Sequence, residues 1–237
     1  MRKTLLLFAI VLLALAGAAQ KTVVHDPNAQ VRPVKGFHGI EVSDAIDLYL
    51  SPGDQEMVVV SAKDIKWRDR IQTEVVDGIL RISLPHHGWS VSNIKAKAYV
   101  SYTTLDRLGA SGSSDIFVDG VITGSQFSID LSGASDFKGA LNVRQLLMTQ
   151  SGASDAQLTG VVSGVFTVRS SGASHVKGLD LVTESCSVHA TGASDIRITV
   201  NKELSAELSG ASSVFYKGEG VVREMHSSGA SSIKKIS

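Results

Sequence analysis

The sequence predicts an all-β protein, a right-handed parallel β-helix or β-solenoid of about seven coils of roughly 20 residues, with a β-rich cap region at its N-terminal end. Three observations predict it. A glycine-centred motif recurs at a nearly constant spacing, apolar and polar residues alternate on both sides of that glycine, and no part of the repeat has the period of a helix. Because one such repeat cannot bury its apolar face alone, stacked repeats must close a common core.

Residues 1–19 predict a secretory signal peptide. Two basic residues precede an apolar run from Leu5 to Leu15, and the small residues that follow fit cleavage after Ala18 or Ala19. The run is shorter than the roughly 20 apolar residues that span a bilayer, and no later stretch comes closer. We therefore expect an exported protein with no transmembrane segment in its mature chain, located in the periplasm, on the outer-membrane surface or outside the cell.

Residues 34–105 form the N-terminal β-rich part. Alternating residues predict strands at 40–42, 46–50 and 95–102, and a continuous apolar run predicts another at 57–60. The segments 71–75 and 79–84 flank Val76-Asp77-Gly78, which is a hairpin signal. Only residues 64–70 could hold a helical turn. This part is either continuous with the solenoid or packed on its end.

Residues 106–237 contain the solenoid repeats. The residues four before and four after each central glycine are apolar in every copy, while the positions at odd offsets before the glycine are mostly polar. This alternation predicts a strand with one buried face. Leucine-rich repeats need a different frame and β-propeller blades a longer period, so a parallel β-helix fits best. The glycines are 18 to 21 residues apart: Gly112, Gly133, Gly152, Gly172, Gly192, Gly210 and Gly229.

The motif around each glycine, typically Ser-Gly-Ala-Ser-Asp, is interpreted as a corner of the coil. A hydroxyl residue precedes every glycine, and a serine follows two positions later in all copies. Glycine supplies a backbone angle that other residues resist, and the hydroxyls can bond the backbone of the corner or one another from coil to coil. The motif therefore predicts a structural corner in each coil and not a row of active sites.

Carboxylates recur three positions after the glycine, at Asp115, Asp136 and Asp155. On coils about 5 Å apart they would repel one another, and a bound calcium ion could relieve that repulsion. The alternative is that each carboxylate bonds nearby backbone amides. Because the column is interrupted by His175 and calcium needs several converging oxygens, we expect no metal or other cofactor, with calcium at these three residues as the weaker alternative.

A second polar column, three positions before the glycine, predicts a mixed-charge stripe at Arg169, His189, Glu207 and His226. It is a candidate binding surface for a polar ligand, and an ordinary solvated face is the alternative. No G-x-S-x-G motif occurs, and the constant spacing leaves little room for inserted loops, so no catalytic residues are expected. Cys186 falls in an inward column and should be an inert, buried thiol. Residues 85–89, with two adjacent histidines, are expected to form an exposed loop.

Three features of the sequence are the segment Phe37-His38-Gly39-Ile40-Glu41-Val42, the 71–82 segment with Asp77-Gly78, and the serial Ser-Gly-Ala-Ser-Asp motifs. Together they resemble the DUF2807 family, also labelled "putative auto-transporter adhesin, head GIN domain". The resemblance runs from about Val34 to Ile233. It implies an exported protein of Gram-negative bacteria with a β-helical fold, and it implies no catalytic residue.

Three functions agree with these patterns. The first is an exported, adhesin-like binding protein of the cell envelope, without catalytic activity, whose partner is a surface glycan or a matrix protein. The alternatives are a carbohydrate-active β-helix enzyme, a lyase or hydrolase, and a purely structural envelope protein. Nucleic acid is not an expected partner, because the chain has 5% aromatic residues, equal numbers of acidic and basic residues and no basic cluster. The sequence predicts no oligomeric state.

Overall fold

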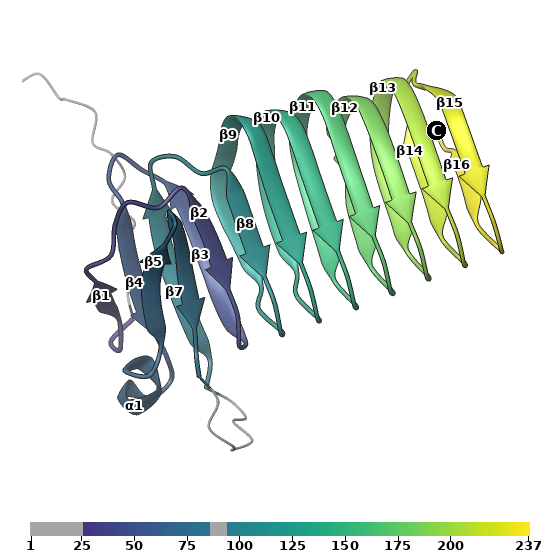
Figure 1. The fold of residues 1–237 in the computed structure, drawn as a ribbon. Helices are drawn as coiled ribbons and strands as arrows, with labels where there is room; N and C mark the ends of the chain where they lie inside the picture. The colour runs from purple at the N-terminus through teal and green to yellow at the C-terminus, as the bar shows by residue number, and fades with distance from the viewer. Residues whose placement is uncertain (1–25, 86–93) are drawn as a thin grey trace, which may run out of the picture.

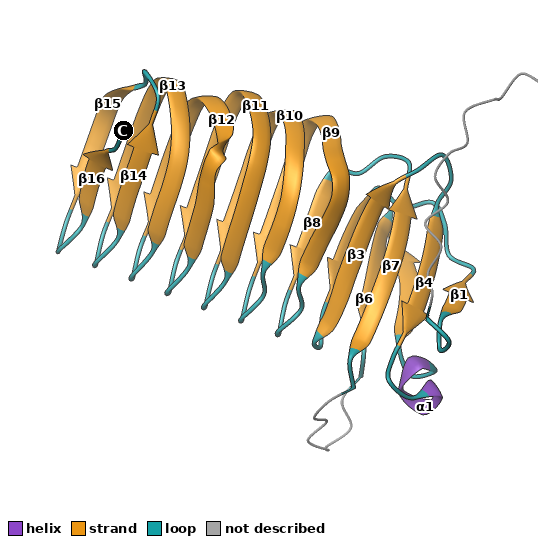
Figure 2. Cartoon of the chain, turned by 180° about the vertical axis from the view of Figure 1, so that it is seen from behind, coloured by secondary structure: helices purple, strands orange, loops and turns teal. Residues whose placement is uncertain are grey.

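The structure, a computed structural model, describes residues 26–85 and 94–237. Within these ranges the chain forms one continuous 16-stranded sheet, coiled into a two-faced solenoid, and one four-residue helix, α1 (Ile65–Arg68). In Figures 1 and 2 the strands descend one face and ascend the other while the chain advances toward its C-terminus, which is a right-handed path. The predicted signal peptide and the histidines of the predicted 85–89 loop lie outside the described residues.

Five long strands each form one complete coil, in parallel register with the next. They bend from one face to the other at places where the register shifts, so the return turn predicted in each repeat lies mostly inside a continuous strand. These strands are β9 (Ile116–Leu131), β10 (Phe137–Gln150), β11 (Asp155–Ser170), β12 (His175–Ala190) and β13 (Asp195–Leu208).

A sixth coil is divided into β14 (Ser213–Lys217) and β15 (Val221–Ser227). The half-coils β8 (Arg107–Ala110) and β16 (Ser232–Lys235) flank the set. The solenoid therefore has about six turns, and the predicted number of seven was slightly too high. The reason is geometric, because a complete coil lies between two corners and seven corners enclose six coils. The predicted fold class is confirmed.

The inward columns form the core. The register stacks Phe127, Leu146, Phe166, Cys186 and Leu204 on successive coils, and each of these side chains is at most 3% exposed. Burial of apolar side chains is the main favourable contribution to folding, at about 25 cal/mol per Å². Stacking the columns gives every inner coil two apolar neighbours, which one repeat by itself would lack.

The corner glycines have the conformation that the motif predicted. Gly172 has φ +81°, and a Cβ atom there would overlap the carbonyl group of Gly152 in the preceding coil. That carbonyl accepts a hydrogen bond of 2.8 Å from the amide of Ala173. The buried Ser174 hydroxyl donates to the carbonyl of Ser171 at 3.0 Å, so this hydroxyl satisfies a backbone group of its own corner.

The N-terminal part continues the solenoid. β2 (Gly39–Val42) pairs in parallel with β8, and β3 (Ile46–Pro52) pairs in parallel with β9. The corner between β2 and β3 has no glycine, and Asp44 and Ala45 adopt positive φ values of 68° and 59° instead. Because this corner lacks the glycine, aligning the sequence on its central glycines does not detect the coil that β2 and β3 form.

Further strands extend both faces beyond this coil. β6 (Ile79–Ser83) pairs in parallel with β2, and β7 (Ala96–Tyr102) with β3. β5 (Gln72–Val76) forms the predicted antiparallel hairpin with β6, while β4 (Met57–Ser61) pairs antiparallel with β7 and β1 (Gln30–Arg32) with β4. One core cluster extends from Phe37 to Tyr216, so the two parts of the chain share a single interior.

Candidate functional site

One outer face carries a row of mostly charged positions that crosses every coil, and we call it the charged row. Each position is in register with the next: Glu74 with Arg81, Arg81 with Glu41, and so on to the last coil. Its members in spatial order are Glu74, Arg81, Glu41, Gly109, Asp130, Thr149, Arg169, His189, Glu207 and His226. The sequence predicted only the C-terminal part of this row as a stripe.

The four predicted stripe residues, Arg169, His189, Glu207 and His226, lie exposed on four successive coils. His189 Nδ1 lies 3.1 Å from Glu207 Oε2, so these two side chains form a pair. His189, Glu207 and His226 line a shallow hollow, whereas Arg169 lines another hollow together with Asp106. The structure brings the four into one line, and their role in binding stays a prediction.

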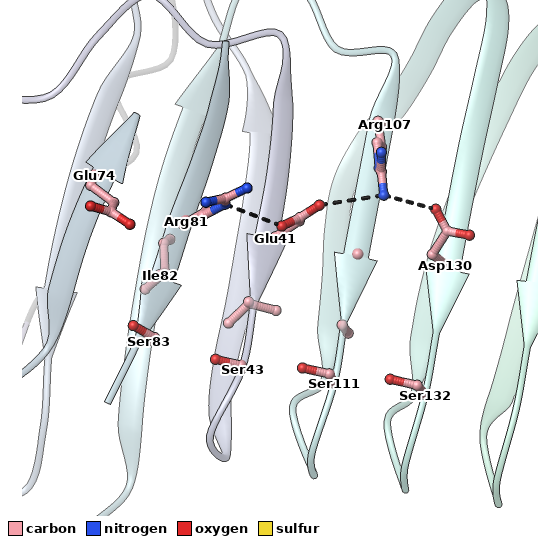
Figure 3. A pocket seen from close by; sticks show the side chains of 13 residues that line it. Glu41, Ser43, Glu74, Arg81, Ile82, Ser83, Arg107, Ser111, Asp130 and Ser132 are labelled. Carbon is pink, nitrogen blue, oxygen red and sulfur yellow. Dashed lines mark ion pairs between the residues drawn. The ribbon is translucent and has the colours of Figure 1, made fainter. Parts of the chain in front are cut away.

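A hollow of about 360 Å³ lies in the charged row at Gly109, and we call it the Gly109 hollow. In Figure 3 the side chains of Arg81, Glu41, Arg107 and Asp130 follow one another along its upper edge. Arg107 Nη2 lies 3.3 Å from Glu41 Oε1 and 3.6 Å from Asp130 Oδ2, and Arg81 Nε lies 3.5 Å from Glu41 Oε2. Sequence reasoning missed Arg81 and Glu41 because they precede the aligned repeats, and Arg107 because it stands outside the column three positions before the glycine, to which Asp130 belongs.

A row of hydroxyls runs beside the charged row, and we call it the hydroxyl row. Each hydroxyl residue follows a member of the charged row by two positions, at the end of its strand or directly after it, and the extended backbone there places both on the same face. Backbone hydrogen bonds between neighbouring coils continue through the hydroxyl row. For example, the Ser111 amide donates to the Val42 carbonyl at 3.0 Å. Its members are Ser83, Ser43, Ser111, Ser132, Ser151, Ser171, Thr191, Ser209 and Ser228, and the first four line the Gly109 hollow (Figure 3).

Residues 36–220, most of the chain and all of the part that carries this hollow, match the family described as "Putative auto-transporter adhesin, head GIN domain". The chain belongs to the DUF2807 family. No curated protein matches this DUF2807 chain.

Solved structures similar to this DUF2807 chain include proteins of Bacteroides fragilis and Parabacteroides distasonis. A "putative adhesin" of Bacteroides fragilis is 21% identical, with a TM-score of 0.80 and coverage of 88% of this chain and 96% of that one. A "putative adhesin" of Parabacteroides distasonis has 19% identity, a TM-score of 0.66 and coverage of 88% and 96%. A "putative lipid binding protein" of the same species has 20% identity, a TM-score of 0.64 and coverage of 90% and 98%. At these identities the likeness shows the fold alone.

The opposite face of the DUF2807 chain carries the aspartate column. Asp115 Oδ1 accepts a hydrogen bond from the Asp136 amide at 3.1 Å, and Asp136 Oδ1 accepts one from the Asp155 amide at the same distance. These bonds agree with the backbone-bonding alternative. Among the described residues, no group of three or more His, Cys, Asp or Glu side chains has the arrangement of a metal site. The prediction about cofactors, calcium included, stays a prediction.

The carboxylates of this column differ in their environment. Burial raises the pKa of Asp115, and the neighbouring Asp136 charge adds to the rise although the Asp136 backbone hydrogen bond opposes it. Burial also acts to raise the pKa of Asp155, but Lys177 and His175 outweigh it, so this pKa is lowered. Lys177 Nζ lies 2.8 Å from Asp155 Oδ2, and His175 Nδ1 lies 3.0 Å from Asp155 Oδ1.

An aromatic stack on the same opposite face was not anticipated from the sequence. Tyr49 stacks on Tyr99 and on Phe117, with 5.2 Å between ring centroids and 21° between ring planes in each pair. Tyr99, Tyr49 and Phe117 are in register on neighbouring strands. Because the inner ring faces cover each other, the stack stabilises the sheet and offers only limited ring surface to a ligand.

Cys186 is buried in the core, as its inward column predicted, and burial raises the pKa of its thiol. A raised pKa keeps the sulfur protonated and therefore a poor nucleophile. Within the described ranges, no helix is both long and apolar enough to cross a bilayer.

Proposed function

We propose that this DUF2807 chain is an exported, adhesin-like binding protein without catalytic activity, and that its ligand lies along the charged row. The observation that carries the proposal is the pairing of two continuous rows on one face, one charged and one of hydroxyls, across every coil. A long polar face of this kind suits an extended or multivalent ligand, because weak contacts repeated on successive coils add up.

The regular connections favour binding over catalysis. From Arg107 to Ser227, successive strands are joined by connections of no more than five residues. An enzyme usually encloses its substrate in a pocket, and solenoid enzymes would build one from loops inserted between coils. The names of the family and of the similar structures, which refer to adhesins, also support a binding role.

A binding screen of the purified mature chain tests this proposal. We expect binding to at least one component of a panel of surface glycans and matrix proteins, and we expect Arg169→Ala and His189→Ala to weaken it. Lys138→Ala is the matched control, because Lys138 is exposed on the opposite face, in register with Phe117.

Each other result of the screen favours a different function. Binding that Lys138→Ala weakens and the two row variants leave intact would place the ligand on the opposite face and contradict the charged row. No binding across the panel would favour a purely structural envelope protein. Release of new sugar ends from a polysaccharide would favour the carbohydrate-active enzyme.

A further inference from the structure

We infer that the Gly109 hollow is a subsite for one sugar residue of an extended, uncharged polysaccharide that runs along the hydroxyl row. The inference rests on the proposed function and deepens it, because it names the chemical class of the ligand. Three features of the face support it: the gap in the charged row, the groups around that gap and the continuation of the face on both sides.

The gap exists because one position in the charged row has no side chain. Of the ten register positions from Glu74 to His226, only Gly109 is a glycine. Its φ lies outside the positive range, so its backbone does not demand glycine. Glycine inside a strand weakens the strand and often marks a bulge, a bend, or a place where a ligand or another backbone approaches closely. Gly109 pairs with Glu41 and Asp130 in unshifted register, so it does not mark a bulge. The hollow of about 360 Å³ is large enough for one sugar ring.

The groups around the gap combine donors and acceptors as a polyol requires. The Arg107–Glu41 and Arg107–Asp130 distances of 3.3 and 3.6 Å are longer than the roughly 2.8 Å of a strong charge-assisted hydrogen bond. The guanidinium therefore retains donors, and the carboxylates retain acceptors, for a third partner. A carboxylate can accept from two neighbouring hydroxyls and a guanidinium can donate to two, which is the pattern that adjacent sugar hydroxyls need.

The charges around the hollow disfavour both an anionic and an apolar ligand. The hollow is lined by three carboxylates, Glu41, Glu74 and Asp130, and by two guanidiniums, Arg81 and Arg107. An anionic sugar would meet a net excess of negative charge, while an apolar ligand would desolvate these charges without replacing their hydrogen bonds. A neutral sugar avoids both costs.

The face continues beyond the hollow in both directions. Ser83, Ser43, Ser111 and Ser132 lie in line along its lower edge in Figure 3, and the hydroxyl row continues to Ser228. Successive hydroxyls are separated by the strand spacing of about 4.8 Å. One sugar residue of an extended polysaccharide has a similar length, so a chain parallel to the solenoid axis can repeat similar contacts on each coil.

The substitution Gly109→Thr tests the inference, because it places in the gap the side chain that the charged row carries at Thr149. A Cβ atom at Gly109 would lie 3.2 Å from Glu41 Cγ, and Glu41 is a partly exposed side chain that can move aside. The matched control is Gly124→Thr in the neighbouring strand β9, where a Cβ atom would meet nothing closer than 3.7 Å. Thermal unfolding of both variants establishes that they fold.

Calorimetric titration with cello-, xylo- and manno-oligosaccharides of increasing length gives the readout. We expect wild type and Gly124→Thr to bind one series with affinity that rises with length, and Gly109→Thr to bind at least about tenfold more weakly. Equal affinity of Gly109→Thr and wild type would overturn the subsite. Binding confined to uronate oligosaccharides would overturn the uncharged class.

The outcome also separates this inference from the function on which it rests. If the charged row binds a matrix protein and no neutral oligosaccharide, the sugar subsite is wrong and the adhesin-like function stands. If wild type binds nothing in either experiment, both are wrong.

Discussion

Arg107 on β8 and Glu41 on β2 form an ion pair, with 3.3 Å between Nη2 and Oε1, across two neighbouring strands that are far apart in the sequence. Their side chains are 46% and 37% exposed, so solvent screens the pair. Exposed ion pairs contribute little to stability. The pair is therefore better suited to presenting hydrogen-bonding groups to a ligand than to holding the coils together.

Arg107→Gln should change the free energy of unfolding by less than about 1 kcal/mol, because an exposed pair of this kind contributes no more than that. Urea unfolding followed by circular dichroism measures the effect. Arg144→Gln, at an exposed position of β10 away from the Gly109 hollow, is the control. A loss well above 2 kcal/mol for Arg107→Gln alone would show that the Arg107 ion pairs are part of the scaffold.

Gly172→Ala should destabilise the solenoid by at least about 2 kcal/mol. The added methyl group would force an alanine into φ +81° and against the Gly152 carbonyl, which accepts the hydrogen bond from Ala173. Gly124→Ala is the control, since that position has no positive φ and an added Cβ atom would meet nothing closer than 3.7 Å. Similar urea midpoints for the two variants would contradict the role given to the corner.

Asp155→Asn should destabilise the protein at neutral pH and have little effect at low pH. Because the folded-state pKa of Asp155 is lowered, its contribution is present above the unfolded-state pKa of about 3.9 and is lost as pH falls through the folded value. The side chain is 36% exposed, so the loss at neutral pH should stay below about 1 kcal/mol. Melting temperatures measured across acidic to neutral pH check both the sign and the window.

Asp115→Asn should have the opposite effect on stability at neutral pH. The folded-state pKa of Asp115 is raised, so its contribution is fully present below the unfolded-state pKa and is lost as pH rises through the folded value. Asparagine keeps an oxygen that can accept from the Asp136 amide but removes the partly buried charge. The variant should therefore melt higher than wild type at neutral pH and gain nothing at low pH. A lower melting temperature at neutral pH would refute the assignment.

Cys186 should not react with a thiol reagent in the native protein. Its side chain is 3% exposed, and burial raises the pKa of its thiol. One equivalent of a chromogenic disulfide reagent should be consumed only after unfolding in guanidinium chloride. Because Cys186 is the single cysteine of the sequence, rapid reaction of the folded chain would mean that the core around Phe166 and Leu204 opens.

Local patterns predicted most of the fold because they describe contacts that repeat. The period of two around each glycine identified both strands of a coil, and the corner motif identified the bend, since the φ of Gly172 and the Ser174 hydrogen bond are decided within a few residues. The same reasoning placed Arg169, His189, Glu207 and His226 on successive coils.

The upstream half of the charged row could not be obtained in this way. Glu41 lies in a coil without a corner glycine, and Arg81 lies in a hairpin strand, so neither belongs to the aligned repeat. The spatial order of the strands also departs from sequence order, because β3 is placed between β7 and β9. No periodicity in the sequence specifies that insertion.

The sequence by itself determined the solenoid, its corners and its buried columns, because these depend on backbone angles and on apolar alternation within each repeat. Only the tertiary structure decided that residues 39–52, 79–83 and 96–102 extend the same two faces, and that Gly109 leaves a hollow between Glu41 and Asp130. The physical reason is that pairing between distant strands is chosen by packing over the whole core, and a missing side chain becomes a hollow only when its neighbours on both sides are in place.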